Sequence, residues 1–69
     1  MKDFVTANGI VAESLSNDRY KVKLDNGVTI TAYPSGKIRV RKIRILVGDR
    51  VTVEISPYDL TNGRIARRL

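Results

Sequence analysis

Hydrophobic and polar residues alternate along most of this chain with a period of two. From Tyr20 to Leu24 the even-numbered positions are apolar, whereas the odd-numbered positions from Arg19 to Lys23 are cationic. A two-residue period places successive side chains on opposite faces of an extended strand. The pattern therefore predicts a strand over residues 19–24, with one face in the core and the other in solvent.

A second alternating segment follows at once and predicts a β-hairpin. Asp25-Asn26-Gly27 separates the first strand from residues 28–33, and Asn-Gly accepts the positive φ of a tight type I′ turn. In the return strand we expect Val28, Ile30 and Ala32 to face the core.

Three further strands are predicted on either side of this hairpin. The first contains Gly9, which is expected at a bend or bulge. Ile65 is expected to face inward in the last strand, as are Val51, Val53 and Ile55 in the strand before it. The predicted strands cover residues 6–15, 50–55 and 63–68, and turns at residues 16–18, 48–49 and 56–59 lead into or out of them.

Residues 34–47 interrupt the strand pattern between the third and fourth strands. Gly36 opposes a long helix that begins earlier, so we expect one or two helical turns over residues 37–42. Three apolar residues are expected to pack this segment against the strands: Ile43, Ile45 and Leu46.

Five strands with a short helical insertion after the third are typical of the oligonucleotide-binding (OB) barrel. The predicted fold class is therefore all-β, a five-stranded OB-fold barrel with a short helix between strands 3 and 4. An SH3-like barrel is the alternative, since it also has five short strands at this length.

Length and composition are those of one small folded domain. The chain has 69 residues, close to the lower limit for folding without disulfides or bound metals. It has no cysteine, which favours a reducing compartment. No apolar run approaches the ~18 residues that span a bilayer, and the first six residues lack the apolar stretch of a signal peptide. We expect a single cytoplasmic domain over residues 1–69, without a membrane partner.

The side chains that most enzymes use are missing. There is no histidine and no cysteine, and four of the seven carboxylates lie in predicted turns, where aspartate usually bonds the backbone. Ser35-Gly36-Lys37 lacks the preceding glycine of a phosphate-binding loop. We therefore expect a binding module that needs no cofactor and no metal, rather than an enzyme.

Positive charge is concentrated in the insertion. The net charge is +6, and no acidic residue lies between Asn26 and Gly48. A one-signed cluster on a small β-domain suits a phosphate backbone, and the alternative is a solvated face. The cluster consists of five residues within eight positions: Lys37, Arg39, Arg41, Lys42 and Arg44.

Two more cationic groups are candidates for phosphate contacts. One group lies on the outer face of the second strand, where its alternative role is to protect a sheet edge. The other lies near the C-terminus, where the alternative is a flexible basic tail. The groups are Arg19, Lys21 and Lys23, and near the C-terminus Arg64, Arg67 and Arg68.

Aromatic residues are few, which favours nucleic-acid recognition through charge over recognition through base stacking. Tyr33 is the one aromatic residue expected to point outward from a strand, where it stacks on a base or packs on the insertion. Proteins that hold single strands by stacking present several such residues. We therefore expect charge-based recognition of folded RNA. A cold-shock-like RNA chaperone is the alternative, and a protein–protein adaptor is a third, although the alternation shows no exposed apolar patch.

Several motifs resemble the bacterial translation initiation factor one family. The most specific are Ile43-Arg44-Ile45-Leu46-x-Gly48-Asp49 and Pro57-Tyr58-Asp59-Leu60-x-x-Gly63-Arg64-Ile65. Shorter matches extend the resemblance over nearly the whole chain: Gly9-x-Val11-x-Glu13, Asp25-Asn26-Gly27, Ser35-Gly36-Lys37-x-Arg39 and Val51-x-Val53-Glu54.

The resemblance implies a monomeric, S1-like OB-fold protein that docks in the aminoacyl (A) site of the small ribosomal subunit. The family touches the decoding helix of 16S-type ribosomal RNA and a neighbouring ribosomal protein. There it blocks premature tRNA entry and supports the other two initiation factors. The family's basic loop maps onto Lys37, Arg39 and the cations after them, and its C-terminal contacts map onto Arg64 and Arg68.

This chain departs from the family pattern at several positions. Tyr33 stands where the family usually has histidine, and Pro34 where it has an aliphatic residue. Val40, Arg41 and Lys42 replace a basic residue, an Asn or His, and an aromatic residue, so the loop keeps its charge in a different arrangement. Arg67 replaces an aromatic or aliphatic residue.

Overall fold

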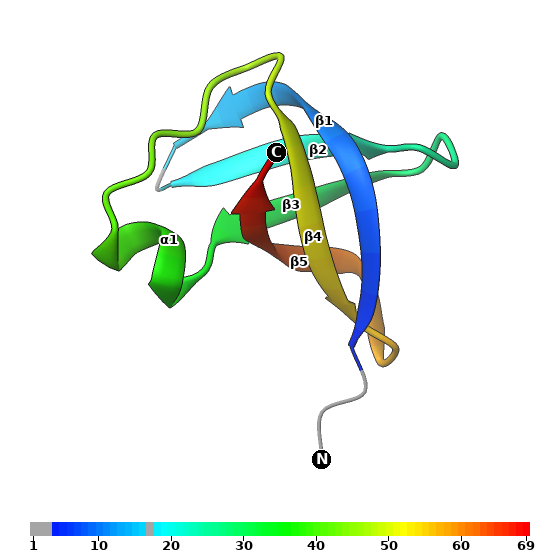
Figure 1. Cartoon of the computed structure of the whole chain (residues 1–69). Coiled ribbons are helices and arrows are strands. Elements are labelled where there is room, and N and C mark those ends of the chain that lie inside the picture. Colours follow the sequence, from blue (N-terminus) through cyan, green and yellow to red (C-terminus); the bar gives the residue numbers. More distant parts are fainter. Residues whose placement is uncertain (1–3, 17) are drawn as a thin grey trace.

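The computed structural model describes residues 4–16 and 18–69, which form a closed five-stranded barrel with one short helix (Figure 1). Around the barrel the strand order is β1-β2-β3-β5-β4, and all neighbouring pairs are antiparallel except β3 and β5. The predicted barrel, with its helix between the third and fourth strands, is confirmed. The elements are β1 (Val5–Leu15), β2 (Arg19–Leu24), β3 (Thr29–Pro34), α1 (Gly36–Val40), β4 (Arg50–Ser56) and β5 (Asp59–Arg68).

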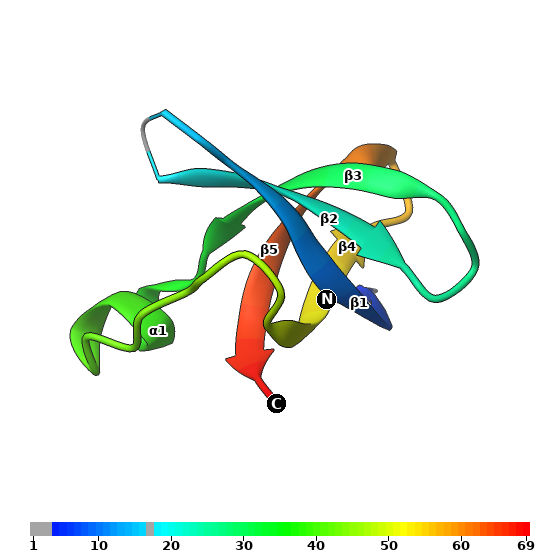
Figure 2. The same cartoon turned by 90° about the horizontal axis from the view of Figure 1, so that it is seen from above.

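Strand β1 crosses the barrel and pairs with a different neighbour in each half, as Figure 2 shows from above. Residues 5–10 pair with β4, residues 9–15 pair with β2, and Gly9 belongs to both ladders. A Cβ at Gly9 would lie 2.6 Å from the backbone oxygen of Lys23, so glycine is required by the close approach of β2. Of the two predicted alternatives at Gly9, a bend or a bulge, the bulge is not found there, because the irregularity in the ladder lies between Val11 and Glu13.

The β2–β3 hairpin is confirmed, but its turn is not type I′. Gly27 has a φ of +91°, whereas Asn26 lacks the positive φ that a type I′ turn requires. The N–H of Gly27 donates to the oxygen of Leu24 (2.9 Å), and the N–H of Leu24 donates to the oxygen of Val28 (2.8 Å). This is the three-residue loop in which a type I turn is followed by a left-handed glycine. The turn predicted at residues 16–18, between the first and second strands, includes Asn17, which lies outside the described residues.

The described core of the barrel contains aliphatic side chains and no aromatic ring. Ile43 and Tyr20 are half-buried against it. Val28 and Leu46, both predicted to face inward, are 51% and 53% exposed, because Val28 precedes β3 and Leu46 begins the turn before β4. The buried residues of this core are Val11, Val22, Leu24, Ile30, Ala32, Ile38, Ile45, Val51, Val53, Ile55 and Ile65.

Strand β5 begins at Asp59, four residues earlier than the predicted start at Gly63. Pairing resumes directly after the two-residue Pro57-Tyr58 turn, where Ser56 opposes Asp59. Residues 59–62 are all exposed, so their hydrophobic pattern gives no sign of a strand.

The carboxylate of Asp59 organises the start of β5 and is expected to titrate below its ordinary range. Its Oδ2 accepts from Nδ2 of Asn62 (3.0 Å), and its Oδ1 accepts from Oγ1 (2.8 Å) and N–H (3.2 Å) of Thr61. These hydrogen bonds, that from Asn62 foremost, hold the pKa of Asp59 below 3.8. The stabilisation is therefore complete above pH 3.8 and is lost as the pH falls through the folded pKa.

An NMR titration of the Asp59 carboxyl is expected to give a midpoint below 3.8, and Asn62→Ala is expected to raise it. A midpoint at or above 3.8 in the unsubstituted protein would show that these hydrogen bonds do not form in solution.

Candidate nucleic-acid interface

Helix α1 is short, and both of its ends are capped. At its start, Oγ of Ser35 accepts from the N–H of Ile38 (3.3 Å). At its end, the N–H of Ile43 donates to the oxygen of Ile38 and that of Lys42 donates to the oxygen of Arg39, both at 3.1 Å. This is a Schellman motif with Lys42 in the left-handed conformation, at a φ of +54°. The helix predicted over residues 37–42 therefore covers 36–40 instead.

Because a left-handed position favours glycine, Lys42→Gly is expected to stabilise the fold by about 0.5–1 kcal/mol. Lys37→Gly is the matched control, since it removes the same charge inside the helix, where glycine costs about 1 kcal/mol. Denaturant unfolding of the two variants measures both changes. If Lys42→Gly proves as destabilising as Lys37→Gly, the segment does not end in this motif.

The segment after α1 is attached to the barrel at its far end. Ile45 is buried, and the turn that follows places Gly48 at a φ of +97°. The N–H of Asp49 donates to the oxygen of Leu46 (3.0 Å), and its Oδ2 accepts from the N–H of Leu46 (2.9 Å). The N–H of Gly48 donates to the oxygen of Val11 (2.8 Å), and the N–H of Val11 donates to the oxygen of Asp49 (2.9 Å), so this turn is fastened to β1. The basic segment is thus held between the buried Ile38 and Ile45 sites rather than hanging freely.

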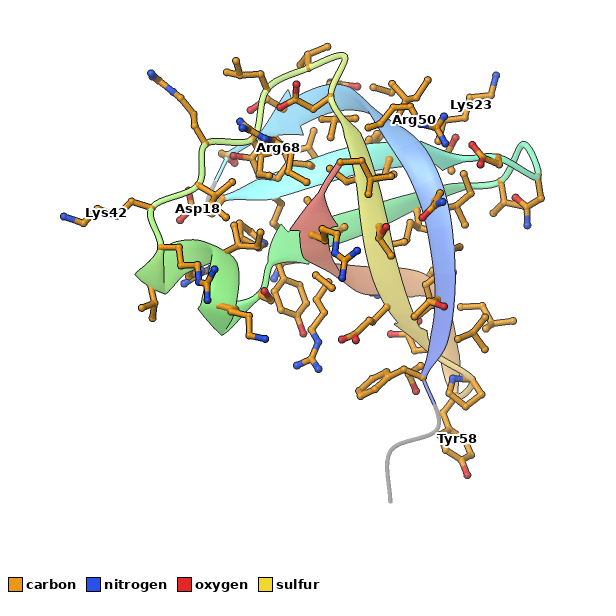
Figure 3. The ribbon with its side chains drawn as sticks, viewed as in Figure 1. Asp18, Lys23, Lys42, Arg50, Tyr58 and Arg68 are labelled. Atoms are coloured by element: carbon orange, nitrogen blue, oxygen red, sulfur yellow. The ribbon has the colours of Figure 1, made fainter. Side chains whose placement is uncertain are left out.

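All five predicted cations of the insertion are exposed, and they lie on α1 and the segment that follows it. Figure 3 shows Lys42 extending away from the barrel beyond the end of α1. Arg68, from the far end of the chain, joins them because its Nη1 donates to the backbone oxygen of Arg44 (2.9 Å). We call these exposed residues the cationic face: Lys37, Arg39, Arg41, Lys42, Arg44, Arg67 and Arg68.

A bulge in β5 explains how Arg67 reaches the cationic face. Thr52 of β4 pairs with Arg67, but the next residue, Val53, pairs with Ile65, so Ala66 is extra. Strict alternation from the buried Ile65 would turn Arg67 inward, whereas in the structure it is exposed. The C-terminal cations are therefore part of an ordered strand and not the flexible tail considered above.

Arg64 is partly engaged within the protein. Its Nε donates to Oε1 of Glu54 (2.7 Å), and its guanidinium lies over the ring of Phe4, 4.9 Å from the centroid. Tyr33 is its partner in the parallel β3–β5 ladder and is 47% exposed, which agrees with the predicted outward position. Phe4, Tyr33 and Arg64 together line a hollow of about 270 Å³. The sequence gives no sign that Phe4 and Glu54 belong beside Arg64, since only the strand register brings them together.

The outer-face cations of β2 extend along the strand from Arg19 at its start to Lys23 near its end. In Figure 3, Lys23 projects near the β2–β3 hairpin, on the opposite side of the barrel from Lys42. Edge protection does not explain them, because in the described part of the chain β2 is paired on both sides. The position of Lys23 makes it suitable as a charge-matched control.

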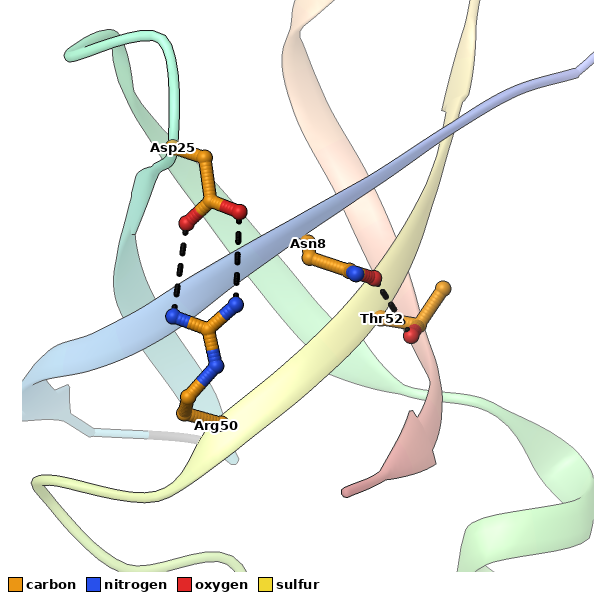
Figure 4. Close-up of polar contacts among 4 residues, drawn as sticks. All are labelled: Asn8, Asp25, Arg50 and Thr52. Carbon is orange, nitrogen blue, oxygen red and sulfur yellow. Dashed lines mark hydrogen bonds and ion pairs between the residues drawn. The ribbon is translucent and has the colours of Figure 1, made fainter.

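Polar side-chain contacts link the start of β4 to the residue after β2, and β4 to β1, as Figure 4 shows. Both terminal nitrogens of Arg50 donate to the carboxylate of Asp25, at 3.3 and 3.4 Å. Oγ1 of Thr52 donates to Oδ1 of Asn8 (2.7 Å). Arg50 therefore has an internal partner, whereas among residues 4–16 and 18–69 no ion pair involves a charge of the insertion.

Residues 4–16 and 18–69 contain no group of three side chains that could hold a metal ion. In the same residues, no helix is long and apolar enough to cross a membrane, and α1 has five residues.

A closed OB barrel with an exposed cationic face defines a small nucleic-acid-binding protein of the OB class. The family model described as "Translation initiation factor 1A / IF-1" matches residues 2–69, so the chain belongs to this family of translation initiation factors, which are not enzymes. It is a ribosome-binding initiation factor of protein biosynthesis.

Individual relatives agree with the family model. The chain is 58% identical over 64 residues to "Translation initiation factor IF-1 2" of Bordetella avium (strain 197N), covering 93% of this chain and 73% of that protein. The solution structure of the corresponding initiation factor from the Wolbachia endosymbiont strain TRS of Brugia malayi is similar, with a TM-score of 0.82 and 47% identity. That match covers 96% of this chain and 78% of the other. YjeQ from Thermotoga maritima matches with a TM-score of 0.77 and 32% identity, over 94% of this chain and 23% of that one.

Proposed function

We propose that this factor binds the A site of the small ribosomal subunit through contacts with the decoding helix of 16S-type ribosomal RNA and with a neighbouring ribosomal protein. In that position it blocks premature tRNA entry and supports the other initiation factors. It acts as a monomer, with residues 1–69 as a single RNA-binding domain.

The cationic face is the observation that carries this proposal. Its charges come from two distant parts of the chain, yet the hydrogen bond from Arg68 to the Arg44 backbone holds them together. No acidic residue interrupts the insertion. Because the backbone of the insertion is anchored by Ile38 and Ile45, the insertion meets a phosphate backbone with less ordering cost than a flexible tail.

We assign the RNA contacts by side-chain chemistry. Arginine donates to phosphate through two parallel N–H groups, lysine acts as a point charge, and an exposed tyrosine stacks on a base. Arg64 contributes through its terminal nitrogens, because its Nε is occupied by Glu54. The proposed contacts are Lys37, Arg39, Arg41, Lys42, Arg44, Arg64 and Arg68 for the backbone and Tyr33 for stacking.

The proposal is tested with labelled protein and purified small ribosomal subunits, in the presence of excess unstructured RNA. Saturable one-to-one binding that resists this competitor and protects the decoding site from chemical probes is expected. If any single strand displaces the protein, it is instead a cold-shock-like RNA chaperone.

A further inference from the structure

The cationic face is not flat, and its centre contains a hollow of about 270 Å³ between α1 and β5. We call this the α1–β5 hollow. Its walls carry four cationic side chains, and its remaining lining is apolar. The lining residues, all in the described part of the chain, include no carboxylate: Lys37, Ile38, Arg41, Ile43, Ala66, Arg67 and Arg68.

Four like charges around one small hollow repel each other unless an anion lies among them. A terminal phosphate group carries roughly 1.5 to 2 negative charges at neutral pH and an internal one about 1, so three linked phosphate groups come close to balancing four cations. The volume of the hollow also suits a small anion of this kind. It is slightly below the roughly 300 Å³ at which pockets for drug-sized ligands begin.

The walls are arranged to hold such an anion. The bulge at Ala66 turns Arg67 outward, and the hydrogen bond to the Arg44 backbone fixes Arg68, so both β5 arginines reach the hollow without a large ordering cost. Lys37 and Arg41 enter from α1 and its C-cap. Between them lies the apolar surface of Ile38, Ile43 and Ala66, which carries no side-chain group that competes for the cations.

We propose that the α1–β5 hollow is an oligophosphate site, which binds two or more closely spaced phosphate groups at once. The phosphates come either from a free oligophosphate, such as the polyphosphate chain of a nucleotide, or from an RNA backbone folded tightly on itself. This site goes beyond the proposed function, because the protein would bind a free oligophosphate in the absence of the ribosome.

Titration calorimetry of the full chain with inorganic triphosphate, at constant ionic strength, tests the site. One-to-one binding is expected, and Arg41→Gln and Arg67→Gln are each expected to weaken it about tenfold. Lys23→Gln removes the same charge on the other side of the barrel and is expected to change the affinity less than about twofold. The absence of saturable binding, or equal losses in all three variants, would overturn the proposal.

A second measurement locates the ligand without any substitution. On addition of triphosphate, the amide signals of Ile43 and Ala66 are expected to shift most in a ¹H–¹⁵N spectrum, and that of Thr29 is expected to stay in place. Shifts spread evenly over the barrel would overturn the site.

A competition experiment distinguishes the two possible sources of the phosphates. If triphosphate displaces the protein from small subunits at constant ionic strength, ribosomal RNA occupies the same hollow; if it does not, the hollow serves a free oligophosphate. Tight triphosphate binding by a protein that fails to bind small subunits would contradict only the proposed function. Binding to small subunits by a protein that does not bind triphosphate would contradict only the oligophosphate site.

Discussion

Replacing Gly9 with alanine is expected to destabilise the barrel by about 3 kcal/mol. The added Cβ would lie 2.6 Å from the backbone oxygen of Lys23 and 2.8 Å from a side-chain carbon of Val22. Gly9 is paired with β2 on one side and β4 on the other, so it cannot move away from one strand without meeting the next. In a domain of this size such a loss lowers Tm by about 12–24 °C, which thermal unfolding monitored by circular dichroism measures.

Gly36→Ala is the matched control for this substitution. A Cβ at Gly36 meets nothing within 4 Å, and Gly36 is the first residue of α1, where alanine is the better helix former. This variant is expected to keep or slightly raise Tm. If Gly9→Ala and Gly36→Ala behave alike, β1 and β2 do not approach as closely as the structure shows.

Neutralising the five cations of the insertion is expected to weaken binding to small ribosomal subunits by roughly a hundredfold to several thousandfold. A phosphate contact contributes on the order of 1 kcal/mol, and neighbouring contacts do not add fully, which gives this range. The side chains are exposed and the segment is anchored by buried isoleucines, so Tm is expected to change by only a few degrees. The variant changes Lys37, Arg39, Arg41, Lys42 and Arg44 to glutamine.

The control for this variant neutralises the outer face of β2 in the same way, at Arg19, Lys21 and Lys23. Because Lys23 lies on the opposite side of the barrel from Lys42 and none of the three residues belongs to the cationic face, the loss in affinity is expected to stay below about tenfold. Equal losses per charge in the two variants would mean that the protein responds to total charge and has no defined RNA-binding face.

The strands and the cationic cluster could be predicted from the sequence because both are local patterns. A two-residue alternation identifies a strand, and five cations without an intervening acid identify a charged surface. Leu46 shows the limit of this reasoning, since its apolar character suggested packing whereas the turn made by Asp49 leaves it exposed.

The parts of the site that could not be predicted depend on strand register. The hydrogen bond between Arg64 and Glu54, and the position of Phe4 beneath the guanidinium, require β5, β4 and the start of β1 to lie side by side. The bulge that turns Arg67 outward has no local signal either, because Ala66 suits an inward or an outward position equally. Register is set by the whole barrel and cannot be read from one segment.

The salt dependence of binding to small ribosomal subunits is the measurement that decides whether the cationic face acts through phosphates. With about six phosphate contacts, the logarithm of the association constant is expected to fall with a slope of about −5 against the logarithm of salt concentration. The five-cation variant is expected to show a much shallower slope, and the β2 variant nearly the original one. A flat response in the unsubstituted protein would contradict recognition of ribosomal RNA through its backbone charge.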